Sequence, residues 1–410
     1  MSNIKKFEIS SLYNLILVRY SGEIWLKSQK VKIRLIKVLM NNIKRMLERE
    51  DILYNKYQLT DDSTRLLFFF NKKDIPKALE LMNKVFGVYS FSPALRTSDR
   101  IKNITQRTIK IAKEILENGD SFALRVKRSG DHKYNSRDVA RIVGQAVMDK
   151  FKDLNIGVDL TNPDKTIFIE IRGKFSYIFT SIIETNWEGL PIEYKKKLIT
   201  MDVGRLSDIL AAFYLLRRGC EIYPIIFQNT NKDSEINKLI DNWREIYRYT
   251  PFSKFKIHII RIDNILEEIS NKLSNKNSIC TFCRLLRYDL ISRILNDDNF
   301  SYLSNCKAIS DGVNLNKSNF CDDYVDLQSI AVSYQFFEQP IFIPLIALSR
   351  DQIKNDLITI SDKLEHIEYC RFKPDKQLIN LGYVIESYTS LDLDSMIQKV
   401  LKDSKTILIK

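Results

Sequence analysis

The pattern of apolar and polar residues in the first third of the chain predicts a small α+β domain. Short runs in which apolar residues alternate or cluster predict strands, and longer stretches with one apolar stripe predict amphipathic helices. The strands are expected at residues 13–20, 65–70 and 88–92, and the helices at residues 28–50 and 74–86. Two helices on such strands give a ferredoxin-like arrangement, which we assign to residues 1–95.

The same patterns predict a second α/β domain over residues 96–185. Its strands are expected at residues 121–128, 166–171 and 177–183, and its helices at residues 104–118 and 136–151, with Ser136 as the N-cap. Cations gather at the end of the first strand and the start of the second helix, at Arg125, Lys127, Arg128, Lys133, Arg137 and Arg141. Any one of them fits a solvated helix face, but together they favour phosphate contacts with a nucleic acid.

Residues 197–410 have the pattern of a parallel α/β domain, after a linker at residues 186–196. A strand at 197–201, a loop around Gly204, a helix at 209–218 and a strand at 220–227 form its opening. In such sheets ligands bind where the first strand passes into its helix, because the helix N-terminus offers unpaired N–H groups to an anion. We therefore expect a binding site beside Gly204.

Composition and charge indicate which classes of partner the protein can have. The 410 residues are enough for two or three domains, and 64 Lys plus Arg against 51 Asp plus Glu give a net charge of +13. A basic surplus favours a polyanionic partner. We find no apolar run that could span a bilayer and no leading apolar segment, so we expect a cytoplasmic protein with no membrane partner.

The cysteines suggest metal or redox chemistry rather than disulfides. Six cysteines in a reducing compartment seldom pair, and Cys280 and Cys283 have the spacing of metal ligands just before an expected helix. Cys370 and His366 lie four residues apart near the end of the domain. The residues themselves leave three options open, namely an iron–sulfur cluster, a structural Zn²⁺ with His366 as fourth ligand, and buried free thiols.

Several segments, in order, resemble the tRNA 4-thiouridine synthase (ThiI) family. Residues 18–30 are similar to its opening pattern RYGEIxLKG, residues 122–183 to its THUMP RNA-binding module, residues 210–222 to the helix that follows its ATP loop, and residues 340–353 to a later strand-loop-helix. The resemblance implies an α/β multidomain protein, with a ferredoxin-like domain, a THUMP domain and a PP-loop-type parallel α/β sheet.

The resemblance also implies a reaction and its partners. In that family ATP with Mg²⁺ adenylates the carbonyl oxygen of a tRNA uridine, expected at position 8 of the tRNA, and sulfur from a donor then displaces AMP to give 4-thiouridine. One branch of the family holds a [4Fe–4S] cluster with three cysteines, which correspond here to Cys280, Cys283 and Cys370. Whether the chain forms a homodimer stays open.

The ATP loop departs from the family pattern SGGxDS. The sequence here is Val203-Gly204-Arg205-Leu206-Ser207-Asp208, and SDGVNL at residues 310–315 stands where the family has TGESLG, with Gly312 kept. Arg205 in place of glycine is expected to open or displace the loop, and its guanidinium could pair with phosphate. Ser207 could donate to a phosphate oxygen and Asp208 could reach Mg²⁺, so these two are the catalytic candidates.

These observations favour an enzyme, a tRNA uracil 4-sulfurtransferase, with two alternatives. Because the loop is altered, a tRNA-binding paralogue without adenylation activity also fits the sequence. A structural or regulatory zinc or iron–sulfur protein that is merely basic fits less of it. The residues expected to bind the nucleotide are Gly204, Arg205, Ser207, Asp208 and Gly312.

Overall fold

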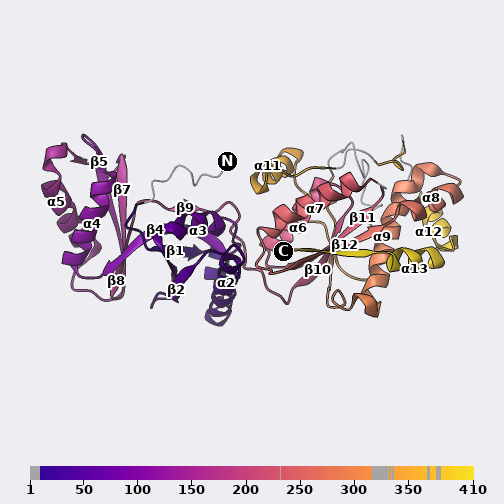
Figure 1. Cartoon of the computed structure of the whole chain (residues 1–410), viewed down its shortest axis with the longest axis horizontal. Coiled ribbons are helices and arrows are strands. Elements are labelled where there is room, and N and C mark those ends of the chain that lie inside the picture. The colour runs from indigo at the N-terminus through magenta and orange to yellow at the C-terminus, as the bar shows by residue number, and fades with distance from the viewer. Residues whose placement is uncertain are drawn as a thin grey trace. The chain divides into compact units, whose positions relative to one another are not determined.

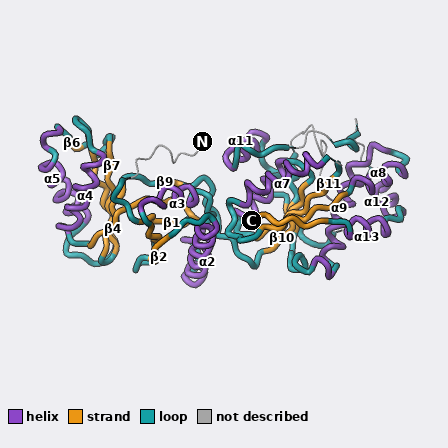
Figure 2. Tube along the Cα trace, in the orientation of Figure 1, coloured by secondary structure: helices purple, strands orange, loops and turns teal. Residues whose placement is uncertain are grey.

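The chain folds into two compact units that divide between Pro191 and Ile192, inside the expected linker. The computed structural model describes residues 10–230, 232–315, 331, 334, 337–366, 370–374 and 380–410. None of the helices in these ranges is long and apolar enough to cross a membrane. Each unit is built on one sheet, and Figures 1 and 2 show its helices packed around the strands.

The first unit contains a single sheet with the strand order β2-β3-β1-β4-β8-β7-β5-β6, and β9 pairs with β4. Its strands are β1 (Leu15–Tyr20), β2 (Tyr54–Leu59), β3 (Leu66–Phe70), β4 (Val88–Ser98), β5 (Ser121–Ser129), β6 (Gly157–Val158), β7 (Lys165–Arg172), β8 (Phe175–Phe179) and β9 (Ile183–Glu184). Its helices are α1 (Gly22–Trp25), α2 (Gln29–Arg49), α3 (Ile75–Met82), α4 (Ile101–Ile115) and α5 (Ser136–Lys150).

Strand β4 joins the ferredoxin-like and THUMP halves, because it pairs first with β1 and then with β8. It is longer than the strand expected at residues 88–92. Helix α5 begins where expected, but its N-cap is Asn135 and not Ser136. The Asn135 side chain accepts from the backbone N–H of Asp138, whose side chain accepts in return from the backbone N–H of Asn135.

A buried carboxylate also holds the two halves together. Glu170 of β7 is only 4% exposed and accepts hydrogen bonds from three guanidinium groups, those of Arg19 (2.9 Å), Arg65 (3.0 Å) and Arg172 (2.9 Å). Arg19 and Arg65 come from the ferredoxin-like half. Burial alone would raise the pKa of Glu170, but the three positive charges outweigh it and lower the pKa to about 2.

The second unit is an α/β sheet with the order β14-β13-β10-β11-β12-β15, in which all neighbours are parallel except the edge strand β15. Its strands are β10 (Lys197–Asp202), β11 (Glu221–Gln228), β12 (Phe255–Arg261), β13 (Ile309–Ser310), β14 (Ile341–Phe342) and β15 (Lys405–Ile409). Its helices are α6 (Leu206–Arg217), α7 (Asp233–Tyr247), α8 (Asp263–Lys272), α9 (Ile279–Leu295), α11 (Arg350–Ile360), α12 (Leu381–Ser390) and α13 (Asp394–Lys402).

A buried histidine at the edge of this sheet leads to a pH prediction. Nδ1 of His258 in β12 lies 3.1 Å from the Thr406 hydroxyl of β15, and burial lowers the pKa of His258 to about 4. Because the unfolded chain takes up this proton near pH 6.5, the free energy of unfolding should fall as the pH drops from about 6.5 to about 4. The expected loss at pH 5 is about 2 kcal/mol. Urea unfolding at pH 7.5 and pH 5 should show it, and His258→Gln should lose less between these pH values than the wild type. Equal losses would contradict the prediction.

Candidate functional site

The topology of the second sheet places the expected binding crevice at the carboxyl ends of β10 and β13. Strand β10 has β11 on one side and β13 on the other, so the strand order reverses at this point. Ligands of open parallel sheets bind where the order reverses. Asp202 and Gly204 lie at and after the end of β10, and Asp311 and Gly312 follow β13. The fold therefore brings together the two segments in which we expected nucleotide-binding residues.

The loop after β10 is shorter than expected, because α6 begins at Leu206 and not near residue 209. Ser207 and Asp208 are thus in the first turn of the helix. The backbone N–H of Asp208 donates to the Arg205 carbonyl (3.1 Å), and the Asp208 side chain accepts from the backbone N–H of Val203 (3.0 Å). Gly204 has a φ of 95°, which glycine adopts without strain. These contacts hold the short loop against the first turn of α6.

Three buried carboxylates accept hydrogen bonds from backbone N–H groups beside this crevice. Asp202 accepts from the backbone N–H of Gly204 (2.8 Å) and from the Trp243 indole (2.7 Å), and Asp208 accepts from Val203 as described above. Asp311 accepts from the backbone N–H of Val313 (3.1 Å). All three side chains are buried. The backbone N–H groups of Val203, Gly204 and Val313 therefore donate to carboxylates of the chain itself.

Arg205 neutralises two of these carboxylates and closes the loop. Its Nε lies 3.1 Å and 3.2 Å from the two oxygens of Asp208, and its Nη2 donates to Asp311 at 2.9 Å. The Arg205 side chain is 8% exposed. The expectation that Arg205 opens or displaces the loop is wrong, because its guanidinium turns inward and binds two acids that the sequence had not paired with it.

Helix α9 supplies the rest of the charge network. Arg284 Nη1 lies 3.4 Å from Asp311, and the Tyr288 hydroxyl donates to Asp311 at 2.9 Å. Burial and the neighbouring Asp208 charge both raise the pKa of Asp202. Burial opposes the ionisation of Asp311 as well, but the charges of Arg284, Arg205 and Arg287 outweigh it and hold its pKa far below the usual range.

Gly312 packs directly against the first turn of α6. A Cβ atom at this position would lie 2.4 Å from the Asp208 backbone nitrogen and 2.5 Å from the carbonyl carbon of Ser207. Gly312 was expected to contact a nucleotide. In the structure its lack of a side chain lets β13 and α6 approach each other.

The three cysteines expected to bind a metal or cluster line one cavity of about 20 Å³, next to the charge network. The cavity is bordered by Cys280, Cys283, Cys370, Val203 and Asn229, with apolar side chains around them. Cys280 and Cys283 are the second and fifth residues of α9 rather than lying before it. The Asn229 amide lies 3.3 Å from Cys370 Sγ, and Val203 belongs to both this cavity and the loop of the crevice.

Sharing a cavity does not make these thiols a formed metal site. Among the described residues, no group of three or more His, Cys, Asp or Glu side chains is arranged to hold a metal ion. His366, the alternative zinc ligand, is exposed and is not part of the cavity lining. Burial raises the pKa of Cys370, while the charge of the buried Arg287 favours its thiolate.

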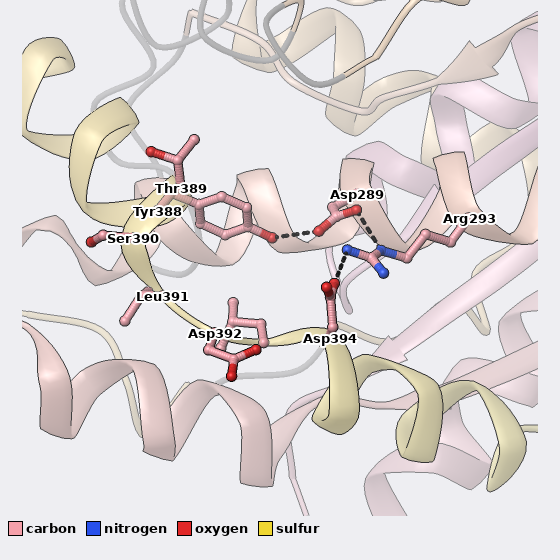
Figure 3. A pocket seen from close by; sticks show the side chains of 9 residues that line it. Asp289, Arg293, Tyr388, Thr389, Ser390, Leu391, Asp392 and Asp394 are labelled. Carbon is pink, nitrogen blue, oxygen red and sulfur yellow. Dashed lines mark hydrogen bonds and ion pairs between the residues drawn. The ribbon is translucent and has the colours of Figure 1, made fainter.

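A second cavity of about 460 Å³ lies between α9 and the segment that joins α12 to α13 (Figure 3). Asp289 accepts from Arg293 (2.8 Å) and from the Tyr388 hydroxyl (3.1 Å), and Arg293 also binds Asp394 (2.7 Å). These contacts hold the C-terminal helices on α9. They therefore position the helix that carries Cys280, Cys283 and Arg284.

The cations expected to contact a nucleic acid lie on the THUMP half of the first unit. Arg128 donates to the Gly130 carbonyl (2.6 Å) beside the end of β5, and Arg137 and Arg141 lie on α5. All six side chains are exposed, namely Arg125, Lys127, Arg128, Lys133, Arg137 and Arg141. Their exposure makes them available to a ligand.

The sequence alone did not identify Asp202, Asp311 or Asn229 as site residues. Asp202 ends β10, and Asp311 and Asn229 directly follow β13 and β11. A polar residue at the carboxyl end of a parallel strand was the signal that could have found them, once the strand order was known.

Comparison with known proteins gives matches along almost the whole chain. Two protein-family models match the first unit, the ThiI ferredoxin-like domain at residues 15–92 and the THUMP domain at residues 98–181. A third, thiamine biosynthesis protein (ThiI), matches residues 198–377. A crystal structure of a 4-thiouridine synthetase with RNA and bound ATP is 19% identical and has a TM-score of 0.79, covering 97% of this chain and 100% of that chain. A Pyrococcus horikoshii protein is 24% identical with a TM-score of 0.60, covering 84% of this chain and 98% of that chain. These two structures show that the fold is shared.

Curated relatives extend over the same length. A probable tRNA sulfurtransferase of Methanosarcina acetivorans is 27% identical over 403 residues, which are 96% of this chain and 93% of the relative. Another from Saccharolobus islandicus is 26% identical over 402 residues, or 96% of this chain and 99% of the relative. With three matching domains in the same order as the sequence predicted, the chain belongs to the ThiI family.

Proposed function

We propose that this protein converts a uridine of tRNA to 4-thiouridine, with ATP as the activating substrate and sulfur carried at Cys280, Cys283 and Cys370. One observation carries the proposal: the cysteine cavity and the crevice at the switch point share Val203. A sulfur carrier and a phosphate site must adjoin if sulfur is to displace AMP from an activated base. The curated relatives with the name tRNA sulfurtransferase support it over the full length.

In this proposal each side chain has a chemical task. The N-terminal end of α6, with Arg205 and Arg284, would neutralise the phosphates of ATP, and Asp208 would bind Mg²⁺ once released from Arg205. The uridine carbonyl oxygen would attack the α-phosphate and expel pyrophosphate. Sulfur delivered from the cysteine cavity would then displace AMP. The protein's contribution is positioning and charge neutralisation.

The donor set of the cavity fits a [4Fe–4S] cluster in chemistry, since three thiolates can hold such a cluster. Cys280, Cys283 and Cys370 would be the ligands, and Asn229 would donate a hydrogen bond to the sulfur of Cys370. A cluster with one iron not bound by the protein would supply a place for external sulfide. A sulfur donor is therefore a second expected partner besides tRNA, and we place the reaction in the cytoplasm.

A thiolation assay with unmodified tRNA, ATP, Mg²⁺ and sulfide tests the proposal. We expect wild-type protein to form 4-thiouridine and Cys370→Ala to lose this activity. Cys220→Ala is the matched control, because Cys220 precedes the amino end of β11 and lies at the opposite edge of the sheet. Thiolation by neither protein under anaerobic conditions, or equal thiolation by the wild type and Cys370→Ala, would contradict the assignment.

One observation favours a second candidate, a tRNA-binding paralogue without adenylation activity. The ion pairs of Arg205 with Asp208 and Asp311 form a buried, hydrogen-bonded arrangement at the place where the first candidate would bind the phosphates. Release of pyrophosphate from ATP in the presence of tRNA separates the two candidates. A protein that binds tRNA but releases no pyrophosphate is the paralogue.

Contact of the THUMP half with tRNA leads to a binding prediction. Arg137 and Arg141 are exposed, one turn apart on α5, and a change of both to Ala should leave the fold intact. If both contact phosphates, the double variant should bind more weakly and the slope of log affinity against log salt should shrink by about 2. The matched control is Lys110→Ala with Lys113→Ala, two exposed cations on α4. Equal salt slopes for both double variants would rule out this surface.

A further inference from the structure

Asp311 occupies a site with the donors of an oxyanion-binding site. Its two oxygens accept from Arg205 Nη2 (2.9 Å), Arg284 Nη1 (3.4 Å), the Tyr288 hydroxyl (2.9 Å) and the backbone N–H of Val313 (3.1 Å). The donors come from three separate segments of the chain and converge on one carboxylate. Guanidinium, hydroxyl and backbone N–H groups are the donors that bind phosphate oxygens in proteins.

We propose that this is a phosphate-binding site whose occupant is the protein's own Asp311, and that phosphate groups enter only when they displace this carboxylate. The inference rests on the proposed function for the identity of the natural ligand, a nucleotide. The site itself is defined by Arg205, Arg284 and Tyr288, whatever reaction the protein performs.

Charge balance explains why an anion must be present in this place. The side chains of Arg205 and Arg284 are 8% and 2% exposed, and the Asp311 side chain is fully buried. Removing one partner of a buried ion pair leaves the other charge buried with neither an ionic partner nor water around it, which is strongly unfavourable. A site of this kind therefore remains filled, either by the carboxylate or by an anion that replaces it.

Location favours phosphate over another small anion. The site lies at the end of β13, beside the N-terminal turn of α6, where the strand order of the sheet reverses. A phosphate group presents several oxygens and can accept from both guanidinium groups and from the helix N-terminus at once. A tethered carboxylate competes with it at a high effective concentration, so the wild type should bind phosphates weakly.

The test is a gain of binding in Asp311→Asn, which keeps the size of the side chain and removes its charge. Thermal unfolding of the full-length protein is measured with pyrophosphate, ATP, orthophosphate, and sodium acetate at matched ionic strength. We expect millimolar pyrophosphate or ATP to raise the midpoint of the variant by several degrees more than that of the wild type. Asp289→Asn is the matched control. It breaks the pair of Asp289 with Arg293 on α9, the helix that also carries Arg284, and this pair lines the cavity of Figure 3, where the two side chains are more exposed.

Comparison of pyrophosphate, orthophosphate and ATP shows which part of the ligand the site binds. Stabilisation by ATP and pyrophosphate alike assigns the site to phosphate groups, and stabilisation by ATP alone adds the nucleoside as a contact. Equal stabilisation by acetate, or an equal gain in Asp289→Asn, overturns the proposal. A folded Asp311→Asn that responds to phosphates no more than the wild type overturns it too.

A second variant keeps the test decisive if Asp311→Asn does not fold in phosphate-free buffer. Recovery of folding with pyrophosphate then supports the proposal, and no recovery overturns it. The double variant Arg205→Gln with Asp311→Asn removes one cation together with the carboxylate. It should lose most of the phosphate response that Asp311→Asn gains. Failure of this proposal leaves the thiolation assay unaffected, so the two outcomes are distinguishable.

Discussion

Gly312→Ala should destabilise the second unit by about 3 kcal/mol or more, because the new methyl group overpacks a junction that cannot move easily. The Cβ atom would lie 2.4 Å from both the backbone nitrogen and the Oδ1 atom of Asp208 and 2.5 Å from the Ser207 carbonyl carbon. Two of these atoms belong to the backbone of the first turn of α6, so no side-chain rotation relieves the contact. Helix α6 and β13 would have to separate, which would also break the ion pair of Arg205 with Asp311.

Urea unfolding measures this effect, with hydrogen exchange of peptides from the second unit as the probe of unfolding. Gly382→Ala is the matched control, since Gly382 lies in α12 and, within the part of the chain that the structure describes, its Cβ would meet only Asn380 Oδ1, at 3.6 Å. Alanine in a helix is favoured over glycine by roughly 0.5–1 kcal/mol, so this variant should be neutral or slightly more stable. Similar stabilities for the two variants would show that β13 and α6 are not in close contact.

Apolar periodicity was sufficient to predict most elements of the fold. Helix α2 and strands β1 and β3 lie within a few residues of their expected positions, because each has a buried face along most of its length. Strand β2 (Tyr54–Leu59) was not predicted, since its residues are only partly buried and show no clear alternation. The pattern identifies an element when the core determines its composition, and fails at an edge strand where it does not.

The site was predictable in location but not in its contacts. Gly204 and Gly312 were identified from two separate segments, and the fold brings both to the crevice. The partner of Arg205, however, is Asp311, which is 106 residues away in the sequence, and no local pattern relates them. The sequence therefore left Arg205 facing a ligand, whereas tertiary structure gives it two carboxylates of the same chain.

The metal prediction shows the same limit. The spacing of Cys280 and Cys283 identified one end of α9, and the fold adds Cys370 to the same cavity. Spacing alone could not indicate that His366 lies outside the cavity, or that the Asn229 amide lies against the Cys370 sulfur. Those facts depend on how β11 and the segment that carries Cys370 pack, which is a property of the whole sheet.

Glu170→Gln should destabilise the first unit by about 3–5 kcal/mol at neutral pH, because it removes the carboxylate from three largely buried guanidinium groups. The side chains of Arg19, Arg65 and Arg172 are 11%, 16% and 10% exposed, and among the described residues only Arg172 keeps another acid, Asp62 at 2.6 Å. Glutamine keeps the size of the side chain, so the loss reports on charge. Hydrogen exchange of peptides from β1, β7 and β8 should show the ferredoxin-like and THUMP halves opening more often.

The pH dependence of the wild type checks the same carboxylate independently. Since the pKa of Glu170 is lowered to about 2 in the folded protein and lies near 4.3 in an unfolded chain, its stabilising effect is complete above about pH 4.3. It should be lost as the pH falls from there toward 2, and Glu170→Gln should lack this part of the acid sensitivity. Glu184→Gln is the matched control, because Glu184 is an exposed acid on β9 that accepts from Tyr89 (2.9 Å). If Glu170→Gln unfolds at the same urea concentration as Glu184→Gln at pH 7, the three arginines do not depend on Glu170, and the joint between the two halves does not rest on this carboxylate.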